Sequence, residues 1–123
     1  SWLHAERPQL VDVDVGHHDA YSTPLRILPN CARLLAGLDV LFVGVHCPIE
    51  TIMARRNADP QGGFYAAGPG VPEPVRRWQE AVHVPGIYDL EVDTATMTAA
   101  DCVAAIAQAL VAPRTAFACL ARL

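Results

Sequence analysis

An apolar run from Val40 to Val45 is the feature of the sequence that most constrains the fold. It is short and rich in β-branched residues, so it predicts a strand rather than a helix. Since neither of its sides is polar, we expect it to be buried on both faces, as in a parallel sheet covered by helices. Pro48 follows closely and suits the first turn of a helix. In open α/β sheets, ligands collect at such carboxyl ends of strands.

Strand and helix patterns alternate along the rest of the chain. Residues 9–15 and 87–92 alternate apolar and acidic or polar residues, which predicts two further strands. Helices are expected over residues 24–37, 48–57, 73–83 and 98–111. Residues 114–123 form a short apolar tail or an added helix. This order predicts a single α/β domain over residues 1–123, three-layered with a mostly parallel sheet.

Several residues are expected to begin, interrupt or end these helices. Ser22 or Thr23 is a candidate cap for the first helix, and Thr98 for the last. Pro29 is expected to interrupt the first helix, and Gly37 to end it.

Composition limits the kind of protein and its partners. The chain has 123 residues, 52% of them hydrophobic, and a net charge of −4, which describes a globular protein that does not bind nucleic acid. No apolar run approaches the roughly 20 residues that span a bilayer, and no signal peptide opens the chain, so we expect no membrane association and a cytoplasmic location. The cysteines are expected to be small buried thiols rather than disulfide partners. They are Cys31, Cys47, Cys102 and Cys119.

A cluster of acidic residues and histidines is the first candidate for chemistry. It comprises Asp12, Asp14, His17, His18 and Asp19. Its side chains could bind a divalent metal, or Asp14 could act at the end of its strand as an acid/base or as a ligand of Mg²⁺-bound water. Against a metal site, ligands usually converge from several elements rather than from one turn. The alternative is a polar turn with solvated histidines.

Two arginine pairs flank a loop rich in glycine and proline, residues 59–72. They are Arg55 and Arg56 before the loop, and Arg76 and Arg77 after it. Guanidinium groups bind phosphate oxygens in pairs, so this arrangement suits a lid that closes over a phosphate. The alternative is that these arginines lie on solvated helix faces, with Arg76 or Arg77 paired to Glu73 or Glu80.

Other polar residues near the predicted strand ends favour structural roles. His46 and His83 each end an element, and a lone histidine there is more often packed than catalytic. Asp89, Glu91 and Asp93 share one face of a strand, where they could bind helix N-termini or arginines.

A phosphate-binding loop is missing from these residues. The sequence has no G-x-x-x-x-G-K-[ST] motif, and all nine basic residues are arginines. It opens at Ser1 without a methionine, and residues 2–7 read as the end of a helix. We therefore expect a fragment or a truncated gene product.

Two blocks of the chain, residues 38–48 and 88–94, together with Glu50, the arginines and His83, resemble the C-terminal part of the chloramphenicol phosphotransferase-like family. The resemblance runs from about Leu10 to Val111. It implies a P-loop kinase-like fold that transfers the γ-phosphate of ATP, with Mg²⁺, to a hydroxyl of an antibiotic-like or metabolite molecule.

Site residues follow from the resemblance only where this sequence matches. It implies a catalytic role for Asp14, with Asp12 second, and a lid role for Arg55 or Arg56. We add His17, His18 and Tyr21 as candidate acceptor-binding residues. For this kinase-like reading we assign no protein side chain as a metal ligand.

The sequence also differs from the family, and these differences lead to further expectations. Its first strand, phosphate-binding loop and catalytic-base strand would lie before Ser1, so we expect this chain alone to be inactive and unable to bind ATP. Without that first strand, either residues 10–15 and 40–45 pair directly or the sheet exposes unpaired edges, so we expect a rearranged sheet or a homodimer. The alternatives are a non-catalytic binding or oligomerising relative of a kinase, and a metal-dependent hydrolase that uses residues 12–19.

Overall fold

Two strands of equal length, β1 (Val43–His46) and β2 (Leu90–Asp93), form a parallel sheet in the computed structural model, which describes residues 26–58 and 70–123. Val43 pairs with Leu90 at one end of the register and His46 with Asp93 at the other. Parallel strands need a long crossover, and its described residues here include two helices. The parallel pairing predicted from the apolar run is therefore confirmed, although both strands lie somewhat later in the chain than expected.

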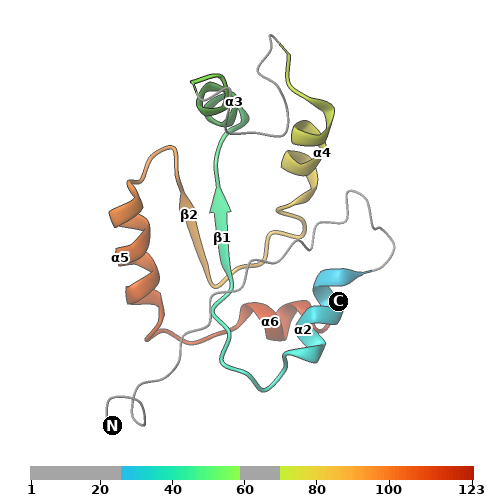
Figure 1. The fold of residues 1–123 in the computed structure, drawn as a ribbon. Helices are drawn as coiled ribbons and strands as arrows, with labels where there is room; N and C mark the ends of the chain where they lie inside the picture. The colour runs from blue at the N-terminus through green and yellow to red at the C-terminus, as the bar shows by residue number, and fades with distance from the viewer. Residues whose placement is uncertain (1–25, 59–69) are drawn as a thin grey trace, which may run out of the picture.

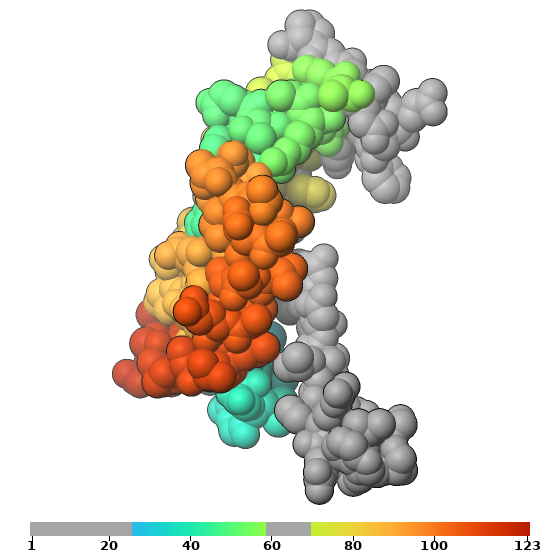
Figure 2. Space-filling view, turned by 90° about the vertical axis from the view of Figure 1, so that its left-hand side faces the viewer, coloured from blue at the N-terminus to red at the C-terminus, as the bar shows by residue number. Residues whose placement is uncertain are grey.

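Five helices are described, and each coincides with a predicted helical segment or with the uncertain tail. They are α2 (Ile27–Leu34), α3 (Ile49–Ala58), α4 (Glu73–Ala81), α5 (Ala99–Ala109) and α6 (Ala116–Leu120). Figure 1 shows α3 and α4 at the carboxyl ends of the strands, and α2 and α6 beside each other near the opposite ends. Figure 2 shows α5 between these two groups on the side of β2. The structure thus mixes helices with a small parallel sheet.

The start of α2 differs from the sequence prediction. Its N-cap is Arg26, in a left-handed conformation with φ of 53°, so the helix begins later than Pro24. Pro29 does not interrupt the helix, because it lies in the first turn, where the backbone N–H has no partner within the helix anyway. Gly37, just past the helix, takes a φ of 93°, as a residue that ends a helix often does.

The start of α5 is as predicted. The Thr98 hydroxyl accepts a hydrogen bond from the Asp101 N–H at 3.1 Å, and the Asp101 carboxylate accepts one from the Thr98 N–H at 3.0 Å. This reciprocal pair is a capping box. The hydrogen bonds from the Thr98 backbone and hydroxyl groups lower the pKa of Asp101.

One face of β1 is not buried as expected. Val45 and its register partner Val92 lie on the same face of the sheet, yet Val92 is 3% exposed and Val45 is 56% exposed. The reason is that α5 packs on β2 and leaves the neighbouring part of β1 uncovered. The prediction that this strand is buried on both faces is therefore wrong at Val45.

The main core lies at the amino-terminal end of the strands, between α2 and α6. Leu28, Ala32 and Leu120 form its buried centre, and Leu120 is fully buried. The Phe42 and Phe117 rings extend the core toward the sheet, with centroids 5.1 Å apart. Residues 114–123, for which the sequence left a tail or a helix open, therefore contain α6. This helix supplies Leu120, the least exposed of the described core side chains.

The cysteines form no disulfide, as expected, but the expectation that they are buried is wrong. All four cysteines are free, and three of them are half-buried while Cys119 is exposed. Among residues 26–58 and 70–123, no helix is long and apolar enough to cross a bilayer.

Candidate functional site

The carboxyl ends of β1 and β2 lie side by side and are the natural place for a ligand in a parallel α/β sheet. β1 runs through His46 into Cys47 and then α3, while β2 ends at Asp93 and continues into Thr94. The Thr94 N–H donates to the His46 carbonyl oxygen at 3.0 Å, so the two chain segments stay together past the strands.

Arg55 lies in the last turns of α3 and reaches back to these strand ends. Its guanidinium donates to the Thr94 carbonyl at 2.7 Å and to the Thr94 hydroxyl at 3.1 Å, and it lies 3.6 Å from the Cys47 thiol. The fork geometry of arginine allows both contacts with Thr94 at once. Arg55 is exposed, so solvent still reaches the group that a phosphate would need.

α4 approaches the same edge through one side chain. The Gln79 amide donates to the Cys47 carbonyl at 2.9 Å. Pro74 lies within the first turn of α4, where it costs no hydrogen bond, and this fixes the start of the helix. The edge is therefore bordered by α3 and α4, which carry the two predicted arginine pairs.

The other three predicted lid arginines differ in their surroundings. Arg76 is exposed and forms an ion pair with Glu73 one turn earlier, which is the pairing that the sequence offered as the alternative to a phosphate role. The hydrogen bond and the charge of Glu73 raise the pKa of Arg76. Arg56 is half-buried and Arg77 is exposed. Their role toward phosphate stays a prediction.

The two predicted packing histidines meet on the polar face of the sheet. The His46 and His83 rings stack with centroids 4.0 Å apart. His46 Nε2 lies 2.9 Å from Glu91 Oε1, and His83 Nδ1 lies 2.5 Å from the Tyr88 hydroxyl. Both histidines are therefore packed against neighbouring side chains, as their positions suggested.

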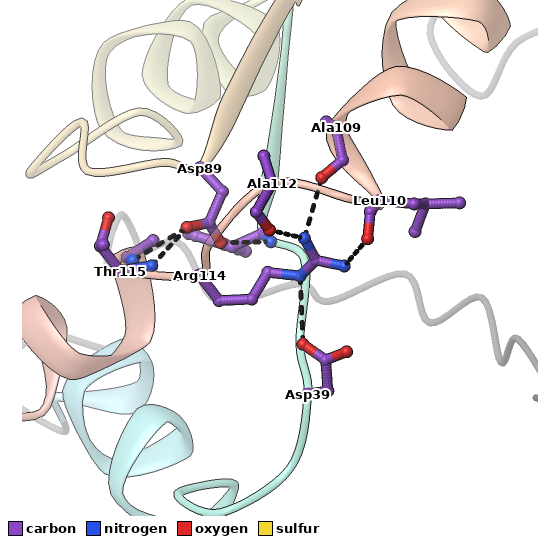
Figure 3. A network of polar contacts seen from close by, with 9 residues as sticks. Asp39, Asp89, Ala109, Leu110, Ala112, Arg114 and Thr115 are labelled. Carbon is purple, nitrogen blue, oxygen red and sulfur yellow. Dashed lines mark hydrogen bonds and ion pairs between the residues drawn. The ribbon is translucent and has the colours of Figure 1, made fainter.

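A second polar network, at the opposite end of the sheet, has a structural role (Figure 3). Asp89 accepts hydrogen bonds from the Thr115 and Ala116 N–H groups at 2.8 and 3.0 Å, at the start of α6. Its other oxygen accepts from the Phe42 N–H at 2.9 Å. Asp89 therefore binds a helix N-terminus, one of the two structural roles that the sequence suggested for it.

Arg114 is the partner of this network that sequence reasoning missed. Its guanidinium donates to the Ala109 and Leu110 carbonyls at 2.8 and 2.9 Å, at the end of α5, and its Nε lies 3.2 Å from Asp39. The available signal was an arginine directly after Pro113 and a predicted helix end, where cations bind terminal carbonyls.

The remaining predicted site residues lie outside the described residues. They are Asp12, Asp14, His17, His18, Asp19 and Tyr21. Most of the predicted lid loop, residues 59–69, and the predicted strand 9–15 also lie outside. Within the described part of the chain, no group of three or more histidine, cysteine or acidic residues could hold a metal ion.

A parallel strand pair, with α3 and α4 at its carboxyl ends, gives this chain a mixed helix and strand structure with a small parallel sheet. The chain belongs to the chloramphenicol phosphotransferase-like protein family, whose model matches residues 9–111. It is therefore a relative of kinase-like phosphotransferases. Searches of curated proteins and of solved structures gave no significant match.

Proposed function

We propose that this chain carries the acceptor and lid part of an ATP-dependent O-phosphotransferase that acts on a small molecule. The observation that carries this proposal is the family match over residues 9–111. The parallel order of β1 and β2 supports it, as does the Arg55 guanidinium at their carboxyl ends.

β1 and β2 are, in this proposal, two strands of a larger P-loop kinase-like sheet with helices on both faces. The uncovered apolar side chain of Val45 supports this, since it lies beside the fully covered Val92 and has no comparable cover from α5. In such a fold, a strand in the position of β1 is covered by helices on both faces.

Asp14 is proposed as the residue nearest to the chemistry, with Asp12 second and His17, His18 and Tyr21 toward the acceptor. A carboxylate at a strand end can accept a proton from an attacking hydroxyl or bind Mg²⁺-coordinated water. ATP and Mg²⁺ are the cofactors that the family implies.

By itself, the 123-residue chain is proposed not to transfer phosphate. It contains no G-x-x-x-x-G-K-[ST] motif and no lysine. Phosphoryl transfer relies on a loop that cradles the phosphates and on placed Mg²⁺. The two arginine pairs, 55–56 and 76–77, would supply the positive charge of a lid over a phosphate, without that cradle.

A binding assay on the 123-residue chain tests this function. We expect saturable binding of a hydroxyl-bearing acceptor from a panel of phenicols, aminoglycosides and nucleosides, and no transfer of ³²P from [γ-³²P]ATP with Mg²⁺. The Asp14→Asn variant should weaken acceptor binding about tenfold, the loss of one charge-assisted hydrogen bond. Glu50→Gln, on the exposed start of α3, is the matched control and should bind normally.

Two results would contradict the proposal. One is ³²P transfer by the chain alone at a rate above that of the Asp14→Asn variant. The other is failure of the whole acceptor panel, which would favour a non-catalytic relative of a kinase. The homodimer expected from exposed sheet edges stays a prediction. Sedimentation velocity at several protein concentrations would measure whether the chain dimerises.

A further inference from the structure

The outer edge of β1, which faces away from β2, carries backbone groups with a defined direction. The Phe42 and His46 carbonyl oxygens accept hydrogen bonds from N–H groups at the two ends of β2, at 3.3 and 3.0 Å. Backbone groups alternate in direction along a strand, so those of Val43 and Val45 point away from β2. Within the described part of the chain, no strand pairs with this outer edge. Such an edge readily adds a further strand.

The side chains along this edge also suit a further strand. Val45 is 56% exposed, although its register partner Val92 is 3% exposed. Residues 43–45 carry no charged side chain, which is a common protection of an open sheet edge. A strand with apolar side chains on the face of Val45 would therefore cover it.

The outer edge of β2 differs in its charge. Two of its four residues, Glu91 and Asp93, are acidic and lie on one face. A strand with carboxylates on that face would place like charges directly opposite each other, which is destabilising. A third strand that contains acidic residues is therefore favoured at β1 rather than at β2.

One segment of the chain that lies outside the described residues fits this edge. Residues 9–15 alternate valine with aspartate, a strand pattern. Their connection to β1 contains α2, and connections that contain a helix join parallel strands. The linker, residues 16–25, can span roughly 33 Å when extended, whereas a four-residue strand is about 13 Å long. The segment can therefore lie parallel to β1 and still lead back to α2.

One register matches the side chains on both faces of β1. Its pairs are Leu10 with Phe42, Val11 with Val43, Asp12 with Gly44, Val13 with Val45 and Asp14 with His46. Apolar side chains then lie beside apolar ones, and Asp14 lies beside an imidazole.

Other registers fit less well. A shift by one residue would turn both aspartates to the valine face. A shift by two would either put Asp12 beside Phe42, which packs against the core, or move Asp14 past the end of β1.

We propose that residues 9–15 add to the outer edge of β1 in this register, as a third parallel strand of the 123-residue chain. This strand covers Val45 and carries Asp14 to the carboxyl ends of the sheet, where Arg55 binds Thr94. Of the arrangements that the sequence leaves open, direct pairing within one chain is thus favoured over a second copy at this edge. The inference stands whether or not the chain acts on a phosphate acceptor.

Amide hydrogen exchange of the unaltered chain tests the third strand. The Gly44 N–H points toward β2, whereas the Val45 N–H points toward the added strand. We expect both amides to be protected to a similar degree. In a two-stranded sheet the Val45 N–H would face solvent and exchange about tenfold or more faster than that of Gly44. Rapid exchange at Val45 together with protection at Gly44 would overturn the proposal.

A charged substitution on the valine face identifies the strand. Val13→Asp should speed exchange at Val45 about tenfold or more while Gly44 stays protected, because only the added strand is displaced. Val71→Asp is the matched control, since Val71 is 42% exposed and lies outside both strands, and it should leave exchange at both amides unchanged. Unchanged exchange at Val45 in Val13→Asp would contradict the pairing.

Nuclear Overhauser contacts in the unaltered chain cover the case in which Val13→Asp does not fold. Neighbouring strands lie about 4.8 Å apart, so the Val13 and Val45 methyl groups should give a contact within one chain. A mixture of isotope-labelled and unlabelled chains separates contacts within a chain from those between chains. A missing contact between Val13 and Val45 would overturn the proposal, as would contacts at Val45 that arise only between chains.

Discussion

The two ends of the small sheet are held in different ways. At the amino-terminal end, α2 and α6 bury Leu28, Ala32 and Leu120. Asp89 there accepts three backbone hydrogen bonds, and Arg114 donates to the carbonyls that end α5. Buried apolar contact and satisfied backbone groups act together at this end.

At the carboxyl end, neither α3 nor α4 has a fully buried residue. Polar side-chain contacts link these helices to the strand ends, among them those from Arg55 to Thr94 and from Gln79 to Cys47, and the His46–His83 stack lies beside them. Ligand-binding elements are commonly drawn from the parts of a protein that open most easily. The contrast indicates an anchored amino-terminal end and a loosely held site.

The largest loss should come from the core of the anchored end. Leu120→Ala removes a fully buried side chain and should lower the free energy of unfolding by about 3 kcal/mol, from lost burial and an unfilled cavity. Leu34→Ala is the matched control, because Leu34 is 85% exposed, and it should change stability by less than about 0.5 kcal/mol. Urea denaturation measures both. Equal losses of unfolding free energy in the two variants would contradict a core centred on Leu120.

Asp89→Ala should be the next most costly change. It leaves the Phe42, Thr115 and Ala116 N–H groups without their acceptor, and the loss should be about 2 kcal/mol. Asp89→Asn keeps one acceptor oxygen and should lose less. If Asp89→Ala were as stable as the parent in urea, the network would not anchor α6.

Gly44→Ala tests the contact between β1 and Tyr88. The added methyl would meet the Tyr88 ring at 2.6 Å, so we expect a loss of about 1–2 kcal/mol from overpacking. Gly70→Ala meets nothing within 4 Å and should be neutral or slightly stabilising. Thermal unfolding of the Gly44→Ala and Gly70→Ala variants compares the two positions. Equal melting temperatures would show that the Tyr88 ring does not lie on Gly44.

Thr98→Ala removes the cap of α5 and should cost about 1 kcal/mol at neutral pH. The capping box lowers the pKa of Asp101 in the folded chain, so its contribution is present above the unfolded value of about 3.9 and is lost as the pH falls through the folded value. Thr98→Ala keeps the backbone N–H bond to Asp101 and removes only the hydroxyl contribution, so the difference between parent and variant should shrink in part in acid below about pH 4. A difference that stays constant down to pH 2 would contradict this origin.

Arg55→Gln should have the smallest effect on global stability, less than about 1 kcal/mol, because the side chain is exposed. It should nevertheless speed amide exchange in α3, since the tie to Thr94 is lost. Asn57→Gln, an exposed and uncharged change on the same helix, is the control and should leave exchange unchanged. Unaltered exchange in Arg55→Gln would mean that packing alone holds α3.

Local patterns predicted the elements well. The apolar run marked β1, the alternation in residues 87–92 marked β2, and Thr98 marked the start of α5. These features depend on side chains a few residues apart, so the sequence displays them directly. The parallel pairing also followed, because both strands are separated by helical segments.

Long-range packing was the part that the sequence concealed. Nothing near Leu120 indicated that a five-residue helix would complete the core, because burial depends on the opposing face of α2. The exposure of Val45 likewise depends on where α5 lies, which the period of the strand does not encode. Of the predicted site, the structure places Arg55 against Thr94 at the strand ends, whereas the acidic residues 12 and 14 lie outside the described residues.

Native-state hydrogen exchange at neutral pH tests the contrast between the two ends most directly. We predict that the Phe42 and Ala116 amides bound by Asp89 exchange only through global unfolding, with the same denaturant dependence as the whole chain. Amides in the middle of α4 should exchange through local opening, at least tenfold faster and with little dependence on denaturant. Protection of α4 equal to that of Phe42 and Ala116 would contradict the account.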